Sequence, residues 1–308
     1  MSPRFFRYLM RLGFRYVRYL LFRTLQLEVS EMRFTNREGR KDYDFTLPNR
    51  MHKNGVAAII RARNEEDKIA LALGSIYDLF DQIIVVNNAS SDRTVDVVKE
   101  FKKRFDDTNK IEIHDYPFKL APCGPEHKNT PEDSLHSIVY FTNYAMSFCK
   151  VQCVFRYDAD MLVCREGRDK FAAFIKKAGA NLRCRWLVPG QTLYRRLDGT
   201  LITSSNLDEI GGESRLFPFS YHNRFIKHPA FEALYSPLPR RVYPRVAFFD
   251  LKFASADEFS HWNTERMPTA RSKLIWKNFS NLVEGKELGK EYEILPATFL
   301  DDQVQYRL

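Results

Sequence analysis

Cysteine is scarce in this chain, and its spacing offers little for cross-linking or zinc binding. The 308 residues include five cysteines, an odd number, at positions 123, 149, 153, 164 and 184. Cys149 and Cys153 are four residues apart, but no histidine or second cysteine pair completes a zinc site. We therefore expect neither a disulfide framework nor a structural zinc, and we expect a reducing, cytoplasmic compartment.

Long apolar runs are missing as well. Within residues 1–23 the longest stretch without a charged residue is Tyr19–Phe22, which is too short for a transmembrane span or a secretory signal. The chain also shows no internal repeat, no low-complexity tract and no nucleic-acid-binding motif. These absences argue against a membrane-spanning start, a repeat architecture and a nucleic-acid partner.

Arginine is abundant at the amino terminus, where no acidic residue precedes Glu28. At 100° per residue, five of the arginines of residues 1–23 fall within an arc of about 80° of one helix, and Phe, Leu and Tyr fill the rest. A basic stripe opposite an aromatic-rich face is typical of a helix lying on an anionic membrane surface. Residues 1–34 are therefore predicted to hold the protein on the inner face of the cytoplasmic membrane. An ordinary amphipathic helix packed on the domain is the alternative.

The net charge is consistent with this interpretation. The chain carries 48 Lys and Arg against 39 Asp and Glu, a net charge of +9. Removing the six arginines of residues 1–23 leaves +3. Most of the excess charge thus belongs to the predicted anchor, and it does not require a nucleic-acid partner.

The middle of the chain alternates between strand and helix patterns. Apolar runs at 56–60, 82–86 and 110–116 read as strands, and apolar residues at helical spacing lie between them. A β-α-β-α-β series of this kind predicts an α/β fold with a mostly parallel sheet flanked by helices. In such sheets ligands bind beyond the carboxyl ends of the strands.

Polar residues follow three of the predicted strands at that edge. They are Arg63–Glu66, Asn87–Asp92 and the pair Asp158 and Asp160, which comes directly after Val154–Tyr157. Residues i and i+2 of an extended chain point the same way, so the two carboxylates are expected to converge. Mg²⁺ and Mn²⁺ prefer such oxygen ligands together with phosphates. The pattern predicts a divalent metal, Mn²⁺ or Mg²⁺, bound with a phosphorylated substrate.

Over residues 54–165 these elements resemble the family 2 glycosyltransferases of GT-A fold, in order and in spacing. Tyr157-Asp158-Ala159-Asp160 is similar to the metal-binding D-x-D motif of that family. The resemblance implies an enzyme, usually inverting, that transfers a sugar from a nucleotide-sugar donor. It also implies metal binding by Asp158 and Asp160, and donor binding by a set of residues at the strand ends: Arg63, Glu65, Asn87, Asn88, Asp92 and Asp158.

The chain departs from the family pattern at two positions. The family usually has Asp where this chain has Asn87, and that Asp commonly pairs with the donor base. An amide both donates and accepts hydrogen bonds, so uracil and cytosine both remain open as the base. Arg61 stands where Pro is common, and the sequence suggests no chemical consequence.

The general base and a third metal contact have weaker candidates. A carboxylate near the acceptor hydroxyl is needed, and the segment after the D-x-D motif offers Glu213 first and Asp208 or Glu209 next. Each is equally well explained as surface charge. Asp250, in the apolar run 246–253, takes the position where related enzymes often have a His, with His261 eleven residues later. We predict Asp250 as a metal contact, with a strand-end acid as the alternative.

The expected organisation has four parts. Residues 1–34 form the membrane-surface helix, residues 35–53 a polar tether, residues 54–253 the GT-A domain and residues 254–308 a short helical extension. The Pro-rich segment 117–133 is predicted to be a flap over the donor, and the segment 217–245 an irregular region for acceptor recognition.

These features predict a metal-dependent glycosyltransferase of the bacterial surface-polysaccharide type. Its acceptor would be a membrane-associated glycan or a lipid-linked precursor of capsule, O-antigen or lipopolysaccharide. A non-catalytic nucleotide-sugar-binding protein on the membrane is the first alternative. A nucleotidyltransferase is the second, although Arg61–Glu66 lacks the glycines of a phosphate-binding loop.

Overall fold

The computed structural model describes residue 17 and residues 29–204, 210–253, 258–259, 269–286 and 292–304. The predicted membrane helix, apart from residue 17 and its last residues, lies outside the described part. So do Asp208, Glu209 and His261. Among the described residues no helix is both long and apolar enough to cross a membrane.

The parallel sheet predicted from the sequence forms the centre of the molecule. Its strands run in the order β6, β3, β4, β5, and all three pairings are parallel. Their bounds are Cys153–Asp158, Val56–Ala62, Gln82–Asn87 and Ile111–Asp115. Helices α2 (Ile69–Ile76) and α3 (Thr94–Phe105) make the crossovers between the last three strands. The predicted α/β fold with its helix-flanked sheet is confirmed.

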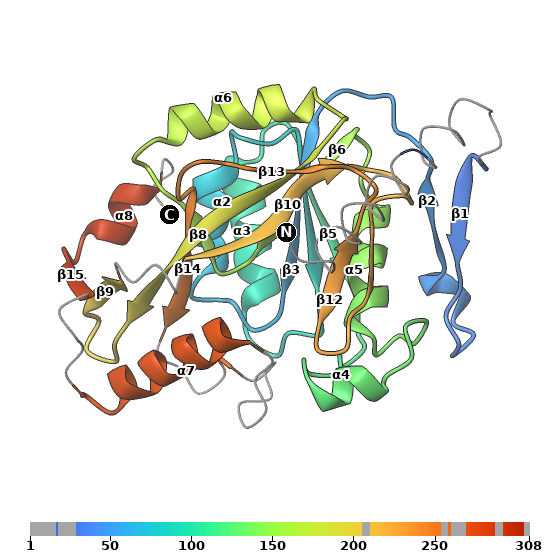
Figure 1. The fold of residues 1–308 in the computed structure, drawn as a ribbon. Helices are drawn as coiled ribbons and strands as arrows, with labels where there is room; N and C mark the ends of the chain where they lie inside the picture. Colours follow the sequence, from blue (N-terminus) through green and yellow to red (C-terminus); the bar gives the residue numbers. More distant parts are fainter. Residues whose placement is uncertain are drawn as a thin grey trace, which may run out of the picture.

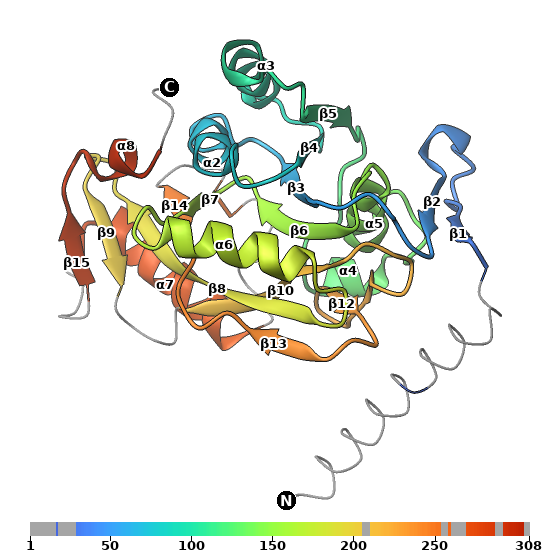
Figure 2. The same ribbon diagram turned by 90° about the horizontal axis from the view of Figure 1, so that it is seen from above.

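A second, largely antiparallel half extends the same sheet beyond β6. Strand β10 pairs with β6 and β8, and β9 and β15 follow at the outer edge; β13 and β14 pair with β8, and β14 also pairs with β7. The bounds are β7 Met161–Val163, β8 Arg185–Arg195, β9 Leu201–Ser204, β10 Gly211–Pro218, β13 Arg240–Val242, β14 Phe248–Phe253 and β15 Tyr292–Leu295. Figure 2 shows the sheet curling from β15 to β5. The carboxyl-terminal extension is therefore not only helical: beside α7 (Ala270–Val283) and α8 (Phe299–Gln303) it adds strand β15.

Both faces of the parallel half are covered. Val56, Ala58 and Ile60 of β3 pack into one apolar cluster with α2, α3 and α6 (Arg168–Gly179). Ala57 and Ile59 point the other way, toward α5 (Ile138–Ser147). A strand buried on both faces needs a continuous apolar run, which explains why β3 shows no alternation of polar and apolar residues.

Residues 35–53 differ from the predicted polar tether. Strands β1 (Glu31–Phe34) and β2 (Phe45–Pro48) form a hairpin, with a 3₁₀ turn (Lys41–Tyr43) between them, at the edge of the molecule beside α5 (Figure 1). Phe45 and Leu47 are buried in the cluster around α5. Phe45 and Leu47 are two residues apart, so both side chains point toward the domain. Their burial holds the hairpin on the domain despite the charged residues around them.

The two loop regions with predicted roles in binding are also structured. Residues 117–133 contain the short helix α4 (Pro125–Asn129). Residues 217–245 contain the hairpin of β11 (Arg224–Lys227) and β12 (Glu232–Tyr235). His127 in α4 bonds through Nε2 to the carbonyl oxygen of His228 at 2.9 Å, so the two regions are joined. Phe219, Tyr221 and Phe225 are buried, so these three rings belong to the core and are not free to stack on sugars.

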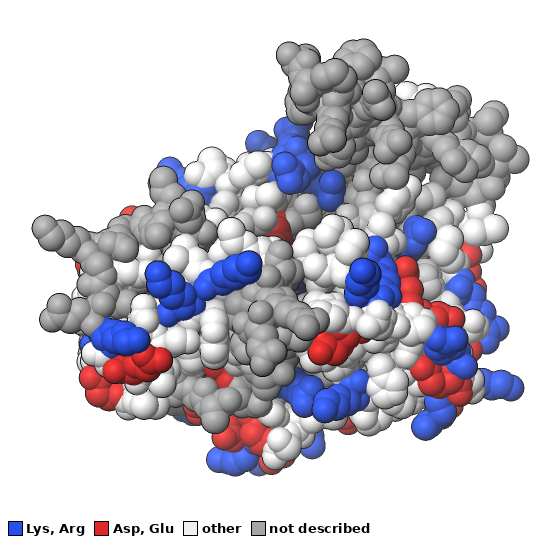
Figure 3. Space-filling model, turned by 60° about the horizontal axis from the view of Figure 1, so that its bottom comes forward, with Lys and Arg blue, Asp and Glu red and all other residues white. Residues whose placement is uncertain are grey.

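Charged side chains of both signs lie on one face of the described part (Figure 3). On the face shown in Figure 3, basic and acidic side chains lie interspersed, and neither sign forms one continuous field. This distribution agrees with a net charge of only +3 outside residues 1–23.

Candidate active site

Three predicted polar segments meet at one edge of the sheet. In the register of the strands, Arg61 of β3 lies beside Asp158 of β6, and Ala62 lies beside Asn87 of β4. Asn87 is in turn level with Asp115 of β5. The carboxyl ends of the parallel strands therefore bring these residues to one edge of the sheet, as the sequence pattern predicts, with Arg61 and Asp158 on one face and Asn87 and Asp115 on the other.

The loops that follow β3 and β4 hold each other in place. The backbone N–H of Asn64 donates to Ser90 Oγ (3.1 Å), and the N–H of Ser91 donates to Asn64 Oδ1 (2.9 Å). Asn64 and Ala89 both have left-handed backbone angles, with φ of 54° and 49°. Non-glycine residues rarely adopt this conformation unless their surroundings impose it. The interlocked loops thus form a rigid rim.

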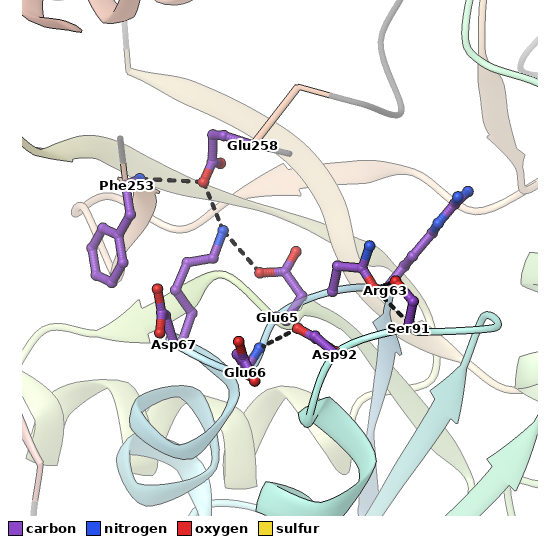
Figure 4. A pocket seen from close by; sticks show the side chains of 10 residues that line it. Arg63, Glu65, Glu66, Asp67, Ser91, Asp92, Phe253 and Glu258 are labelled. Carbon is purple, nitrogen blue, oxygen red and sulfur yellow. Dashed lines mark hydrogen bonds and ion pairs between the residues drawn. The ribbon is translucent and has the colours of Figure 1, made fainter. Parts of the chain in front are cut away.

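A cavity of about 410 Å³ opens beside this rim. It is lined by residues 63–68, Ser91, Asp92, Phe253 and Glu258, and Figure 4 shows their side chains around it. Arg63, Glu65 and Asp92, three of the predicted donor-binding residues, are among them. Asp92 also braces the rim, since its carboxylate accepts from the N–H groups of Thr94 (2.9 Å) and Glu66 (3.1 Å).

Asn87 and Asn88 have different roles. Asn87 Nδ2 donates to Asp115 Oδ1 at 2.9 Å, so an acidic group stands beside the position where the family has Asp. Sequence reasoning missed Asp115, although it ends the third strand. Asn88 was predicted to bind the donor, but its side chain is buried and its amide donates to the carbonyls of Tyr116 (3.1 Å) and Phe118 (2.7 Å). These bonds give its amide a structural role, and its predicted part in donor binding stays a prediction.

Asp158 lies among three arginines. Arg215 Nη1 donates to its Oδ2 at 2.8 Å, Arg61 Nη2 to its Oδ1 at 3.2 Å, and Arg156 Nη2 is 3.7 Å from Oδ2. Burial would raise the pKa of Asp158, but the guanidinium groups of Arg156, Arg215 and Arg61 hold it well below its usual value. Arg61, to which the sequence assigns no chemical role, is therefore a direct partner of the D-x-D motif.

Two glutamates complete what we call the arginine cluster, defined by Arg61, Arg156, Arg215, Asp158, Glu213 and Glu232. Glu213 contacts Arg156, and its side chain remains 52% exposed. Glu232 lies 2.9 Å from Arg61 and 3.4 Å from Arg156. Partial desolvation opposes ionisation of the half-exposed Glu213, but Arg156 and Arg215 lower its pKa, so it is ionised at neutral pH. Its predicted role as general base stays a prediction, and its place next to Asp158 is compatible with it.

A second group, which we call the lysine cluster, surrounds Asp160. It consists of Lys68, Lys252, Glu65, Asp160, Asp250 and Glu258. Lys252 Nζ donates to Asp160 Oδ2 at 2.5 Å and to Asp250 Oδ1 at 2.9 Å. Burial would lower the pKa of Lys252, but the carboxylates of Asp160, Asp250 and Glu258 keep it well above its usual value. The structure thus brings Asp160 and Asp250 together around an ammonium group, whereas Asp158, which is expected to converge with Asp160, pairs with the arginines instead.

Lys68 joins this cluster to the cavity. Its Nζ lies 2.8 Å from both Glu65 and Glu258. Sequence reasoning missed both lysines and Glu258. One pattern was available for Lys252: it stands two residues after Asp250 in a strand, so the two side chains point the same way.

The carboxylates of Asp158, Asp160 and Asp250 are not free to coordinate the predicted divalent metal. The carboxylate of Asp158 is neutralised by three guanidinium groups, and those of Asp160 and Asp250 share Lys252. Within the described residues, no group of three or more His, Cys, Asp or Glu side chains is arranged to hold a metal ion. Mg²⁺ and Mn²⁺ need several oxygen ligands free of competing cations.

Residues 57–116 match the family model of glycosyl transferase family 2. No curated protein matches the chain. Among solved structures, glucosyl-3-phosphoglycerate synthase from Mycobacterium tuberculosis, solved with Mn²⁺, UDP-glucose and phosphoglyceric acid, is 16% identical, with a TM-score of 0.30 over 46% of this chain and 44% of that one. S. aureus TarS is 12% identical, with a TM-score of 0.35 over 68% of this chain and 62% of that one. This chain spans less than half the length of the mycobacterial structure, and similarities this low say nothing about substrate or metal.

Proposed function

We propose that this protein is a glycosyltransferase that moves a sugar from a nucleotide-sugar donor to an acceptor hydroxyl. The observation that carries the proposal is the cavity at the carboxyl ends of β3 and β4, lined mainly by residues of the segment that matches the family model. Its volume of about 410 Å³ is in the range of small-molecule sites in proteins. It also lies where open α/β sheets bind their ligands.

Arginine side chains supply the groups that a diphosphate requires. Arg63 lines the cavity, and its Nε is buried without a hydrogen-bond partner among the described residues. The same holds for the Nε atoms of Arg61, Arg156 and Arg215 in the arginine cluster. Guanidinium groups bind phosphate oxygens through charge-assisted hydrogen bonds. We assign Arg63 to donor binding.

The reaction follows from this arrangement. The bond between the anomeric carbon and the phosphate oxygen breaks, and the nucleoside diphosphate leaves with the bonding electrons. Fixed positive charge at that point stabilises the leaving group. The acceptor hydroxyl attacks the anomeric carbon and gives its proton to a carboxylate, for which Glu213 is the candidate. The sequence-based prediction of Mn²⁺ or Mg²⁺ is not part of this proposal, because its proposed ligands are already paired.

We further propose that the acceptor is a membrane-associated glycan or lipid-linked precursor, met at the inner face of the cytoplasmic membrane. The basic and aromatic pattern of residues 1–23 supports this location. Deleting residues 1–23 should release the protein from anionic liposomes and leave donor binding unchanged. Sedimentation of the shortened protein with the liposomes would contradict the anchor.

Thermal unfolding with nucleotides tests the donor site. UDP, GDP, CMP and their sugar conjugates should be compared with and without Mn²⁺, and one base should raise the melting temperature. Arg63→Gln should lose that stabilisation, whereas Arg104→Gln, an exposed arginine on α3, should keep it. If no nucleotide stabilises the protein in either condition, the proposed function is wrong. Stabilisation without any sugar transfer would favour the non-catalytic alternative.

A further inference from the structure

The ammonium group of Lys252 stands where the D-x-D motif would be expected to present a cation. It contacts Asp160 and Asp250 and lies 3.6 Å from Glu258. The Lys252 side chain is only 6% exposed, so these contacts are not made at the surface. Three carboxylates from different segments therefore converge on one buried positive charge.

The pairing of β14 with β7 determines the position of Lys252 beside Asp160. Strand β14 pairs with β7, directly after the D-x-D motif, and Asp250 is level with Met161. The N–H of Leu251 donates to the carbonyl of Asp160 at 2.7 Å, which ties the turn of the motif to β14. Asp250 and Lys252 are two residues apart in the strand, so both side chains point toward Asp160. The sheet thus holds Lys252 at the motif.

A displaced Lys252 would lack an equivalent partner among the described residues. Glu258 is the remaining acid within reach, and its other oxygen is 2.8 Å from Lys68. Arg271 lies 3.4 Å from Asp250 and adds further positive charge on the same side. A divalent ion between Asp160 and Asp250 would place two more positive charges next to these groups, in a site that excludes most water. The other half of the motif, Asp158, is likewise occupied by arginines.

We propose that Lys252 is the resident cation of this site, so that Asp160 and Asp250 are neutralised by a lysine of the chain and donor binding does not depend on a divalent metal. The inference rests on the proposed function, because it concerns the same nucleotide-sugar site. It assigns Lys252 a positioning role: its charge sets the arrangement of the two aspartates beside the cavity.

Electron paramagnetic resonance of Mn²⁺ in the presence of the full-length protein tests the inference without reference to activity. The wild-type protein should leave the signal of free Mn²⁺ unchanged at equimolar concentration. Lys252→Ala should take up one Mn²⁺ per chain, because it leaves two carboxylates facing a vacated position. The double variant K252A/D160N should lose that uptake.

Two further variants serve as controls. Lys252→Arg keeps the positive charge and should take up no Mn²⁺. Lys110→Met removes a half-buried lysine that donates to the Phe80 carbonyl at 3.2 Å, away from the motif, and should also take up none. Stoichiometric uptake of Mn²⁺ by the wild-type protein, abolished by Asp160→Asn, would overturn the inference.

Nucleotide binding gives a second, independent measure. The nucleotide that stabilises the wild-type protein should raise its melting temperature equally in EDTA and in Mn²⁺. Stabilisation that appears only with Mn²⁺ would overturn the inference and leave the proposed function standing. Absence of stabilisation in both conditions would overturn the proposed function, while the Mn²⁺ titration would still decide on Lys252. Should the Lys252 variants not fold, these two wild-type measurements decide alone.

Discussion

The arginine cluster contains Asp158 and the lysine cluster contains Asp160, two residues later. The clusters differ in the kind of cation and in the exposure of Glu213. In the arginine cluster Glu213 is 52% exposed and can be reached by an incoming molecule. In the lysine cluster the side chains of Lys252 and Glu258 are 6% and 2% exposed. A guanidinium fork keeps further N–H groups available after binding a carboxylate, whereas an ammonium between two carboxylates is a compact point charge. We conclude that Glu213 is the exposed acid of the arginine cluster, whereas the lysine cluster surrounds a buried charge and reaches the cavity through Glu65, Lys68 and Glu258.

The largest effect is expected from removing the central cation of the arginine cluster. Arg156→Met takes away one of three arginines near Asp158, one of two near Glu232 and the closest one to Glu213. Loss of one partner from a fully buried pair costs about 3–5 kcal/mol, and the loss here should be smaller because Arg61 and Arg215 remain. Urea denaturation should show this loss in the free energy of unfolding. Arg93→Met, which breaks an exposed pair with Glu100, should cost about 0–1 kcal/mol. Equal costs for the two variants would contradict the special place of the arginine cluster.

Glu213→Gln separates catalysis from binding within the arginine cluster. Loss of a general base lowers turnover by about 10²–10⁴-fold. Nucleotide-dependent thermal stabilisation should persist, since Arg63 and the cavity are untouched. Asp208→Asn and Glu209→Gln are the matched comparisons. Full turnover in Glu213→Gln, with a loss in either of the others, would move the base to that residue.

Glu65 of the lysine cluster and Asp158 of the arginine cluster should respond oppositely to pH. Burial raises the pKa of Glu65 from 4.5 to about 8, against the effect of the nearby Lys68 ammonium. An acid whose pKa rises on folding stabilises the protein below its unfolded pKa, and this contribution is lost as the pH increases through about 8. The lowered pKa of Asp158 works the other way, so its contribution is lost only in acid.

Unfolding measured between pH 5 and pH 9 tests this difference. Glu65→Gln should reduce the loss of stability that the wild-type protein shows between about pH 5 and about pH 8, because the glutamine has no proton to lose. Asp158→Asn should not change this loss, because Asp158 stays ionised over that range. An unchanged loss in Glu65→Gln would show that Glu65 ionises normally in the folded protein.

The sequence predicts the parallel half of the fold well because its strands are buried on both faces. Apolar runs such as 56–60 admit few other structures, and the strand ends then follow from the polar residues after them. The β1–β2 hairpin escapes prediction because only Phe45 and Leu47 mark it among many charged residues. Two apolar residues predict a buried strand only when the surface of α5 on which they pack is known.

The sequence predicts the acidic residues of the site better than its basic residues. Spacing predicts that Asp158 and Asp160 converge, and the position of Asp250 relative to the family predicts it as a third contact; the structure pairs Asp160 with Asp250 and places Asp158 among the arginines. The cations are harder to foresee. Arg156 and Lys252 look like ordinary charged residues in strands, and Glu232 comes from a hairpin more than 70 residues away from Arg156. Their role depends on long-range packing, which the pattern of one segment does not contain.

A crystal structure of the full chain with the stabilising nucleoside diphosphate bound would decide the central question directly. We predict that the nucleotide lies in the cavity between Arg63 and Asp92, with its diphosphate directed toward the arginine cluster and Lys252 still between Asp160 and Asp250. A nucleotide bound elsewhere would contradict the proposed function. A metal ion between the two aspartates, with Lys252 displaced, would contradict the inference about the resident cation.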